Sequence, residues 1–413
     1  MVSSGNAAVS GTPYDDTSGA ALDLTDPAAF IENDPHAYWA RMRSAEPVRW
    51  HPPVGARPGF WAVARYGDVQ DCYKDAARLS SARGTVLDVL LRGGDSAGGR
   101  MLAVMDRPRH RELRQVMLRS FSPRVLGRVE EAVRQRADAL VAAVVGAGEA
   151  DAGRDIAEHL PLNTVCDLLE LPVTDRPQLL AWNKRALSSD SVEEDLFDAL
   201  EARNEILSYF VDVVRERRRS HGEDVISVIA GAGVGGGPMS EDDLALNCYS
   251  LILGGDESTR VSTIGALHAL GTYAGEWRRL RDGEVEVRTA VEEVLRWVTP
   301  AMHFARTATT GLRIGPAEVA EGDIVTLWNI SANNDPDVFA EPRRFDAGRR
   351  HNPHLSLGHG PHFCLGAFLG RLELAAVLDA LIRRVRRIEI LEEPPRVYSN
   401  FLFGHSALRM RLD

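Results

Sequence analysis

The sequence predicts a mainly helical protein with small antiparallel β-sheets. Two observations lead to this prediction. Long stretches place apolar residues at three- and four-residue spacing, which is typical of amphipathic helices, and strand signals are short and few. Of the 413 residues, 44% are hydrophobic and 26% are charged, the balance of an ordinary globular protein. No window approaches 18 consecutive apolar residues, so we expect no membrane-spanning helix and no membrane partner.

The N-terminal part of the chain is expected to lie outside the folded region. Residues 1–24 lack a basic segment followed by an apolar one, so they do not resemble a signal peptide. We predict a disordered lead-in over 1–24 and a single domain over 25–413. The first clear strand signal covers residues 59–65.

The middle of the chain is predicted to be helical. Residues 124–146 and 193–219 carry apolar groups at helical spacing, and the second segment finishes in arginines that suit a helix C-terminus. The glycine-rich piece 231–239 is predicted to be a flexible connector.

One very long helix is expected after this connector. It would begin after Ser240, a favourable N-cap, and end near Gly275. At 1.5 Å per residue its length is about 45 Å, enough to cross the middle of the fold. Further strands are predicted over 312–329 and 400–412.

Charge and cysteine content restrict the class of protein. The formal net charge of −11 argues against a nucleic-acid partner. The four cysteines are far apart and form no CxxC pair, which fits a reducing compartment and argues against a zinc site. We therefore expect a cytoplasmic protein.

The most informative stretch surrounds Cys364. Gly358, Gly360 and Gly366 permit close backbone approach around the sulfur, and an amphipathic helix follows directly. A helix N-terminus stabilises a thiolate. The residues alone leave three interpretations open: an inert buried cysteine, a nucleophile with a neighbouring histidine as its base, or the axial ligand of a haem iron.

The pattern Gly358-x-Gly360-x-His362-x-Cys364-x-Gly366 resembles the haem-binding loop of cytochromes P450. The resemblance implies that Cys364 is the metal ligand of haem b, with Leu357 and Gly358 beside the haem. The family usually has phenylalanine where this chain has Leu357, so packing against the sulfur is expected to be looser.

Three further segments resemble the same family. Glu293 and Arg296 match its ExxR motif, and the resemblance makes Arg344 the third partner of that buried pair. His110 and Arg114 match a helix that binds the haem propionates; they share one helix face, and Arg306 and His362 match two more donors.

The stretch LGGDESTR resembles the distal motif of the family. The resemblance places Gly255 over the iron and makes Glu257 and Ser258 a pair that relays protons to bound dioxygen. Serine stands where threonine is usual, so Thr259 is kept as a residue that shares this role.

The resemblance implies a haem-thiolate monooxygenase that inserts one oxygen atom from dioxygen into a C–H bond or an alkene. Its electrons would come from NAD(P)H through external redox proteins, a ferredoxin and a ferredoxin reductase. Atypical chemistry on the same fold (coupling, dehydration or peroxide-driven oxidation) stays open, as does a non-catalytic recruitment module. The substrate is expected to be a mostly apolar natural-product intermediate, either a free small molecule or bound to a carrier protein. We expect the protein to be a monomer.

Two sets of residues are assigned by position in similar proteins. Those expected to line the substrate pocket are Val86, Leu87, Leu91, Leu251, Ala301, Met302, His303, Phe304, Phe401 and Leu402. Those expected to form a basic docking patch for the redox partner are Arg107, Arg109, Arg111, Arg119, Arg343, Arg349 and Arg350.

Overall fold

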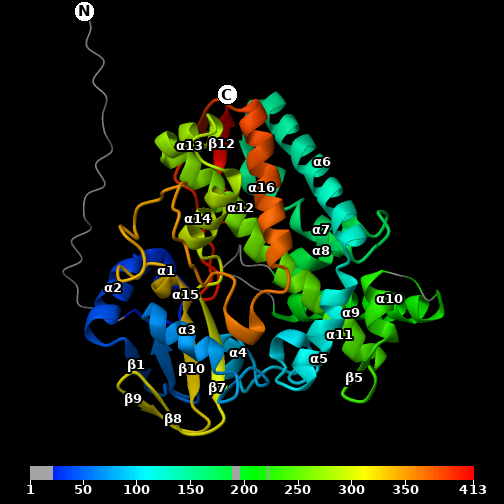
Figure 1. Ribbon diagram of the computed structural model, residues 1–413, viewed down its shortest axis with the longest axis vertical. Helices are drawn as coiled ribbons and strands as arrows, with labels where there is room; N and C mark the ends of the chain where they lie inside the picture. The colour runs from blue at the N-terminus through cyan, green and yellow to red at the C-terminus, as the bar shows by residue number, and fades with distance from the viewer. Residues whose placement is uncertain (1–21, 188–195, 221, 223) are drawn as a thin grey trace, which may run out of the picture.

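The computed structural model describes residues 22–187, 196–220, 222 and 224–413. Helices make up most of this part of the chain and gather at the top and right of Figure 1, whereas the largest sheet lies at the lower left. The helices are α1 (Pro27–Glu32), α2 (Pro35–Ala45), α3 (Tyr66–Lys74), α4 (Leu87–Leu91), α5 (Arg109–Ser120), α6 (Pro123–Ala147), α7 (Pro161–Leu168), α8 (Arg176–Leu187), α9 (Leu196–Ser220), α10 (Val225–Gly231), α11 (Glu241–Gly255), α12 (Glu257–Thr272), α13 (Ala274–Arg281), α14 (Val287–Val298), α15 (Asn329–Ala332) and α16 (Ala367–Arg384). Short turns of other helix types are η1 (Leu102–Val104), η2 (Gly153–Ala157) and η3 (Gly360–His362).

The largest sheet has five strands in the order β1-β2-β10-β7-β3. Its pairs are antiparallel except β2 with β10, which run parallel in a register that sets Phe60 opposite Ile324. The prediction of an antiparallel sheet is therefore wrong, because this sheet is mixed. The strands β2 and β10 lie far apart in the chain, so no tight hairpin joins them and they can pair in parallel. The strands are β1 (Val48–His51), β2 (Phe60–Val63), β3 (Leu79–Ser80), β4 (Glu149–Asp151), β5 (Gly233–Val234), β6 (Gly237–Pro238), β7 (His303–Ala308), β8 (Leu312–Ile314), β9 (Ala317–Val319), β10 (Ile324–Trp328), β11 (Ile388–Ile390) and β12 (Arg409–Leu412).

The helices share one large apolar core, and a second, smaller core lies under the five-stranded sheet. The second core contains Leu22 and Leu24, which are 7% and 0% exposed. Residues 1–21 of the predicted lead-in lie outside the described residues, but the last residues of that segment belong to the packed structure. No helix in the described ranges is long and apolar enough to cross a membrane.

The predicted helices over 124–146 and 193–219 correspond to α6 and to α9, although residues 193–195 lie outside the described part of the chain. Ser122 caps α6 by accepting the Val125 N–H, and Pro123 occupies the first turn. In the same way Ser240 caps α11 by accepting the Asp243 N–H, as predicted.

The single helix predicted over 240–275 is wrong, because the chain forms α11 and α12 with an interruption at Asp256. Two consecutive glycines precede that residue and weaken the helix. Gly275 does not act as the stop: α12 ends at Thr272, and Gly275 lies inside α13. This interruption sets the geometry of the distal side of the site.

Two other predicted segments also differ. The supposed connector 231–239 forms the β5–β6 hairpin, since Gly235 and Gly236 adopt positive φ angles of 70° and 87° and close a tight turn. Of the strand predicted over 400–412, β12 covers only the last residues; the part before it makes isolated bridges. The predicted strands over 59–65 and 312–329 correspond to β2 and to β8, β9 and β10.

Candidate active site

The loop before α16 holds Cys364 in a fixed position. In Figure 1 this orange loop lies between α16 above it and α5 at the lower right. Gly358 and Gly360 adopt positive φ angles of 68° and 69°, which favour glycine. A Cβ on Gly360 would stand 2.6 Å from the Tyr73 carbonyl oxygen, so the loop approaches α3 closely. The Cys364 N–H donates to the Leu357 carbonyl at 2.9 Å and closes the loop.

Cys364 differs electrostatically from the other three cysteines. Cys72, Cys166 and Cys248 are buried, and burial raises the pKa of each thiol to about 12. Cys364 is only partly buried; burial raises its thiol pKa too, but the backbone N–H of Gly366 hydrogen-bonds the sulfur and opposes that rise. Among the four cysteines it is therefore the one suited to act as a thiolate ligand.

Four nitrogen donors surround the loop, as the sequence predicted. The rings of His110 and His362 lie 4.1 Å apart, centroid to centroid. Arg114 donates to the Phe363 carbonyl at 2.6 Å. Arg306 is 4% exposed and donates to the carbonyl of its neighbour Ala305 at 2.7 Å.

The charges of this cluster fit the two carboxylates of a haem. Burial together with the nearby arginines lowers the pKa of His110 to about 4 and that of His362 to about 2, so both imidazoles are neutral donors. Arg114 and Arg306 carry the positive charge, and no carboxylate of the described residues lies within ion-pair distance of either. Two buried or half-buried guanidinium groups without a carboxylate partner favour an anionic ligand, and two propionates would supply it.

The ExxR pair lies behind this loop and is fully hydrogen-bonded. Glu293 and Arg296 are both 0% exposed, and Arg296 donates to both carboxylate oxygens of Glu293 at 2.8 Å. The Asp346 N–H donates to Oε1 of Glu293 at 3.0 Å, while Arg349 Nε and Asn352 Nδ2 donate to Oε2 at 2.9 and 3.1 Å. Five hydrogen bonds therefore satisfy one buried carboxylate.

The third partner of the pair is Arg349, and the prediction of Arg344 is wrong. The side chain of Arg344 points outward and pairs with Glu341, whereas only its backbone carbonyl reaches Arg296, at 3.4 Å. Arg349 has an almost buried side chain, 10% exposed, that pairs with Glu293. The residues between 333 and 350 follow an irregular path, so their sequence carries no periodicity that would show which arginine points inward.

A second network was not predicted. Arg371 of α16 binds both oxygens of Glu292 at 2.6 and 2.8 Å, and His354 contacts the same carboxylate at 3.1 Å. Burial acts to raise the pKa of Glu292, but the hydrogen bonds from Arg371 and His354 outweigh it and hold the pKa at about 2. A motif search misses this contact because its two halves lie 79 residues apart.

On the distal side, the two glycines of the LGGDESTR stretch play different parts. A Cβ on Gly254 would meet no atom within 4 Å, so Gly254 borders open space. A Cβ on Gly255 would lie 2.8 Å from the Val165 side chain, so Gly255 allows close packing against α7. The structure thus gives the two glycines different surroundings, and the assignment of Gly255 to the haem face stays a prediction.

The hydroxyl groups of Ser258 and Thr259 also have different neighbours. Ser258 donates to the Gly254 carbonyl at 3.4 Å, a long and weak hydrogen bond that leaves the hydroxyl available. Thr259 faces α16: a Cβ on Gly370 would lie 3.9 Å from its Oγ1. The structure thus places Ser258, and not Thr259, on the side of Gly254.

The acidic residues at the helix interruption were only partly predicted. Glu257 pairs with Arg260 at 3.1 Å, and Arg260 also donates to the Ser406 carbonyl. Asp256, which was not predicted, is 5% exposed; one of its oxygens accepts from Asn183, and the other has no partner. Burial, and next the charge of Glu257, raises the pKa of Asp256 to about 7.

Half of the predicted pocket residues border partly open space. The residues that are only partly buried are Val86, Leu251, Phe304, Phe401 and Leu402. The residues that are instead buried are Leu87, Leu91, Ala301, Met302 and His303, and most of them pack into the smaller core.

His303 is the clearest correction in this set. Its ring lies 4.5 Å from that of Trp328, its Nε2 accepts the Leu87 N–H at 3.2 Å, and burial lowers its pKa to about 3. Because the ring is 0% exposed and packs against those of Trp328 and Phe401, His303 contributes to the core, which was not predicted from the sequence.

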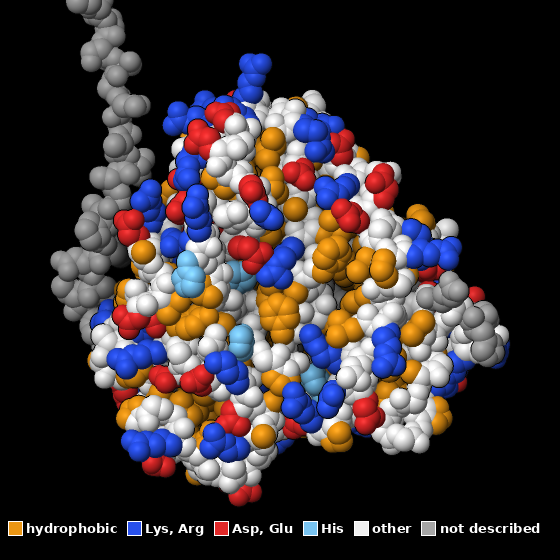
Figure 2. Space-filling view, in the orientation of Figure 1, with side chains coloured by type: hydrophobic (Ala, Val, Ile, Leu, Met, Phe, Trp, Pro, Cys, Tyr) orange, Lys and Arg blue, Asp and Glu red, His pale blue; other side chains and the backbone are white. Residues whose placement is uncertain are grey.

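The predicted docking patch divides into three groups. Figure 2 shows basic side chains over α5. There Arg107, Arg111 and Arg119 are exposed, and no carboxylate of the described residues pairs with them. Arg350, before the cysteine loop, is also exposed and pairs with no carboxylate of the described residues. Arg109, by contrast, pairs with Asp243 at 3.2 Å.

Arg349 and Arg343 do not belong to this patch. Arg349 is taken up by the ExxR network. Arg343 stacks on Trp297, 5.2 Å from the ring centroid, and lines a cavity beside α2. In Figure 1, α2 lies at the far left of the molecule and α5 at the lower right, so these arginines form separate surfaces.

Comparisons with known proteins agree with this geometry. A family profile described as Cytochrome P450 matches residues 287–406. Cytochrome P450 NovI of Streptomyces niveus is 40% identical over 391 residues, covering 95% of this chain and 96% of the relative. Linalool 8-monooxygenase of Pseudomonas putida is 32% identical and covers 94% of this chain and 98% of the relative.

A solved structure, that of P450 OxyD, which is involved in the biosynthesis of vancomycin-type antibiotics, has a TM-score of 0.86 at 33% identity. The match covers 95% of this chain and 99% of that one. The resemblance first found in the cysteine loop thus extends over nearly the whole length. The chain belongs to the cytochrome P450 family and is a P450 monooxygenase, an enzyme type that uses a cysteine-ligated haem and dioxygen.

Proposed function

We propose that the protein is a haem-thiolate monooxygenase that inserts one oxygen atom into a C–H bond or an alkene of a mostly apolar small molecule. The observation that carries this proposal is the convergence of α5, β7 and the cysteine loop, which bring the nitrogen donors His110, Arg114, Arg306 and His362 into the neighbourhood of Cys364. A nucleophilic cysteine would need a basic histidine, but His362 has a pKa of about 2 and cannot serve as a base near neutral pH.

The proximal residues divide the work of holding the haem. Cys364 provides the sulfur ligand, and the Gly366 N–H moderates the negative charge on that sulfur. Leu357 and Gly358 form the turn beside it, and Leu357 accepts the Cys364 N–H.

The propionates are assigned to the donor cluster of His110, Arg114, Arg306 and His362. Bound haem supplies the activation of dioxygen; the protein's own groups position it and deliver protons.

On the distal side we assign the last proton transfer to Ser258, whose hydroxyl is held only weakly by the Gly254 carbonyl. Glu257 is held by Arg260, which keeps its carboxylate at the edge of the interruption in the helix. These two residues therefore define where protons enter from the protein side.

The substrate is proposed to be a natural-product intermediate, either free or tethered to a carrier protein. Val86, Leu251, Phe304, Phe401 and Leu402 are apolar and only partly buried, which suits a mostly apolar ligand. The relationship to NovI and to OxyD, a protein of antibiotic biosynthesis, supports this class.

The electrons are proposed to come from NAD(P)H through a ferredoxin reductase and a ferredoxin. Arg107, Arg111, Arg119 and Arg350 remain as the cationic docking surface for the acidic partner, since none of them pairs with a carboxylate of the described residues. We further propose that the protein acts in the cytoplasm as a monomer.

The test compares the carbon monoxide spectrum of the reduced wild-type protein with those of Cys364→Ser and Cys248→Ser. The long-wavelength band typical of thiolate ligation should be present in the wild type and in Cys248→Ser, which removes a buried thiol, and absent in Cys364→Ser. Loss of the band in the control alone would contradict the assignment. Product formed with dioxygen and a reductant, and not with peroxide alone, would then establish the monooxygenase reaction.

A further inference from the structure

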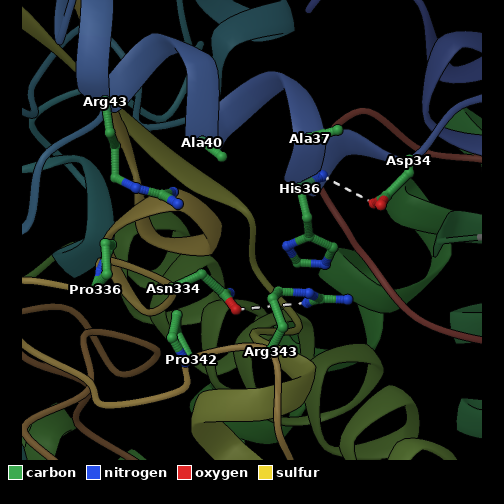
Figure 3. A pocket seen from close by; sticks show the side chains of 9 residues that line it. All are labelled: Asp34, His36, Ala37, Ala40, Arg43, Asn334, Pro336, Pro342 and Arg343. Atoms are coloured by element: carbon green, nitrogen blue, oxygen red, sulfur yellow. Dashed lines mark hydrogen bonds between the residues drawn. The ribbon is translucent and has the colours of Figure 1, made fainter. Parts of the chain in front are cut away.

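A cavity lies away from Cys364, between α2 and the irregular segment before the cysteine loop. Its volume is about 350 Å³, and Figure 3 shows its lining. The lining residues are Asp34, His36, Ala37, Ala40, Arg43, Asn334, Pro336, Pro342 and Arg343. The lining contains neither Cys364 nor any of the four nitrogen donors near it, but the Pro342 carbonyl also accepts from Arg296 of the ExxR pair at 2.9 Å.

The cavity has two arginines whose hydrogen-bonding capacity is mostly unused. Arg343 makes one long contact, from Nη1 to Asn334 Oδ1 at 3.4 Å, and its guanidinium is held over the Trp297 ring. Arg43 donates through Nη1 to the carbonyl and hydroxyl of Ser331 at 3.0 Å, while its Nε is buried without a partner. Each arginine offers five N–H groups in all.

The acidic residues nearby do not neutralise these arginines. No carboxylate in the described ranges lies within 4.0 Å of the guanidinium of Arg43 or Arg343. Asp34, the one acid in the lining, caps α2 by accepting the His36 N–H at 3.0 Å. A third arginine, Arg396, lies close enough to act on His36 and donates only to backbone carbonyls. Asp335 and Asp337 act on Arg43, and Asp34 acts on Arg343, only from beyond ion-pair distance. Neither guanidinium therefore has a direct carboxylate partner among the described residues.

His36 provides an independent indication of a ligand. It is 8% exposed, and its Nδ1 has no hydrogen-bond partner. Figure 3 shows its ring directed into the same space as the Arg343 side chain. A buried polar ring that leaves a nitrogen unsatisfied carries an energetic cost, which a bound polar group near it would reduce.

We propose that this cavity binds the oxyanion group, a phosphate or a carboxylate, of a small molecule. The fork of Arg343 and the remaining N–H groups of Arg43 would hold two of its oxygens, as guanidinium groups commonly do. His36 would lie beside the anion as a further polar contact. The site is separate from the haem site, so its occupancy would add to the monooxygenase function and does not depend on it.

The test titrates the purified holoenzyme with inorganic phosphate and, separately, with malonate as a carboxylate probe. Sodium chloride at matched ionic strength serves as the reference, and calorimetry measures affinity. We expect one equivalent of phosphate or malonate to bind, and Arg343→Gln to weaken that binding about tenfold or more. Arg344→Gln is the matched control, because Arg344 points outward and pairs with Glu341; it should bind as the wild type does.

A second variant tests the proposal independently, in case Arg343→Gln does not fold. Ala40→Phe fills the cavity from the exposed face of α2 without removing a charge, and it should also abolish binding. The carbon monoxide spectrum shows for each variant whether the haem site is intact. Binding of phosphate alone or of malonate alone identifies which oxyanion the site takes. Heat no different from that with chloride, or equal affinity in Ala40→Phe, would overturn the proposal.

Discussion

Two buried carboxylates differ in the number of hydrogen bonds that they accept. They lie on opposite sides of the position assigned to the haem. Glu293 behind the cysteine loop accepts five hydrogen bonds, two of them from Arg296 and one from Arg349. Asp256, at the interruption between α11 and α12, has one partner, Asn183, and one oxygen with none. Both residues are at most 5% exposed. The proximal carboxylate is therefore fully hydrogen-bonded, whereas burial raises the pKa of the distal one to about 7.

This comparison predicts the largest effect for Glu293. Glu293→Gln leaves Arg296 and Arg349 buried with no full countercharge, so we expect it to lower the free energy of unfolding by about 3–5 kcal/mol. Haem retention should fall with it. Denaturant unfolding of the holoenzyme measures both.

Arg344→Ala is the control for Glu293→Gln, because its side chain is exposed. We expect a change within about 0.5 kcal/mol. Equal losses in the two variants would show that the network is not centred on Glu293 and Arg349.

The distal carboxylate should show a pH dependence of stability. The pKa of Asp256 rises from 3.8 to about 7 on folding, so this residue has no effect on stability below about pH 4, lowers stability progressively as the pH rises from 4 to 7, and exerts its full destabilising effect above pH 7. Asp256→Asn should therefore be more stable than the wild type at pH 8, by at most about 4 kcal/mol, with the difference shrinking as the pH falls toward 4. Unfolding curves of both proteins between pH 4 and 8 measure this difference. A difference that does not change with pH would contradict the prediction.

The distal hydroxyl groups permit a finer test. Ser258→Ala should lower the product formed per electron pair consumed about tenfold or more, because proton delivery loses its last group. Thr259→Val is the matched control: its hydroxyl lies near Gly370 of α16, so coupling should stay close to the wild-type value. Both are measured with any compound that the enzyme oxidises. The reverse order of effects would place Thr259, and not Ser258, on the distal side.

The smallest effect is expected at the surface. Arg111→Glu should slow reduction by an acidic ferredoxin severalfold at low ionic strength, and the difference should shrink as salt is added. Arg313→Glu, an exposed change on β8 far from α5 in Figure 1, is the control. Stopped-flow reduction of the haem measures the rates. Identical rates for Arg111→Glu and the wild type would remove α5 from the docking surface.

Most of the proximal site could be predicted from the sequence because its residues lie close together in the chain. The glycines around Cys364 and the four-residue spacing of His110 and Arg114 each occupy one short segment. The short fixed spacing makes the resemblance to the P450 family recognisable, and the resemblance, not the spacing itself, assigns the roles. Helix caps such as Ser240 were predictable because a cap and its partner also lie close together in the chain.

The errors arise where partners are distant or the backbone is irregular. Arg344 and Arg349 look alike in sequence, and only the folded path shows which one points inward. Asp256 was read as a helical residue because its neighbours fit the helical spacing, yet its buried bond to Asn183 of α8 joins residues 73 positions apart. His303 resembled a pocket residue, but its ring packs at a tilt against that of Trp328 from another strand.

The irregular segment between 333 and 350 contains almost no helix or strand. Arginine side chains, in place of helix or sheet hydrogen bonds, bind its backbone carbonyls. Arg296 binds the carbonyls of Asn333, Pro342 and Arg344, and Arg349 binds those of Ala340 and Arg344. The course of this segment therefore depends on two inward arginines and not on the identity of its outward residues. Substitutions at its exposed positions should therefore leave the path of this segment, and the position of the cysteine loop that follows it, unchanged.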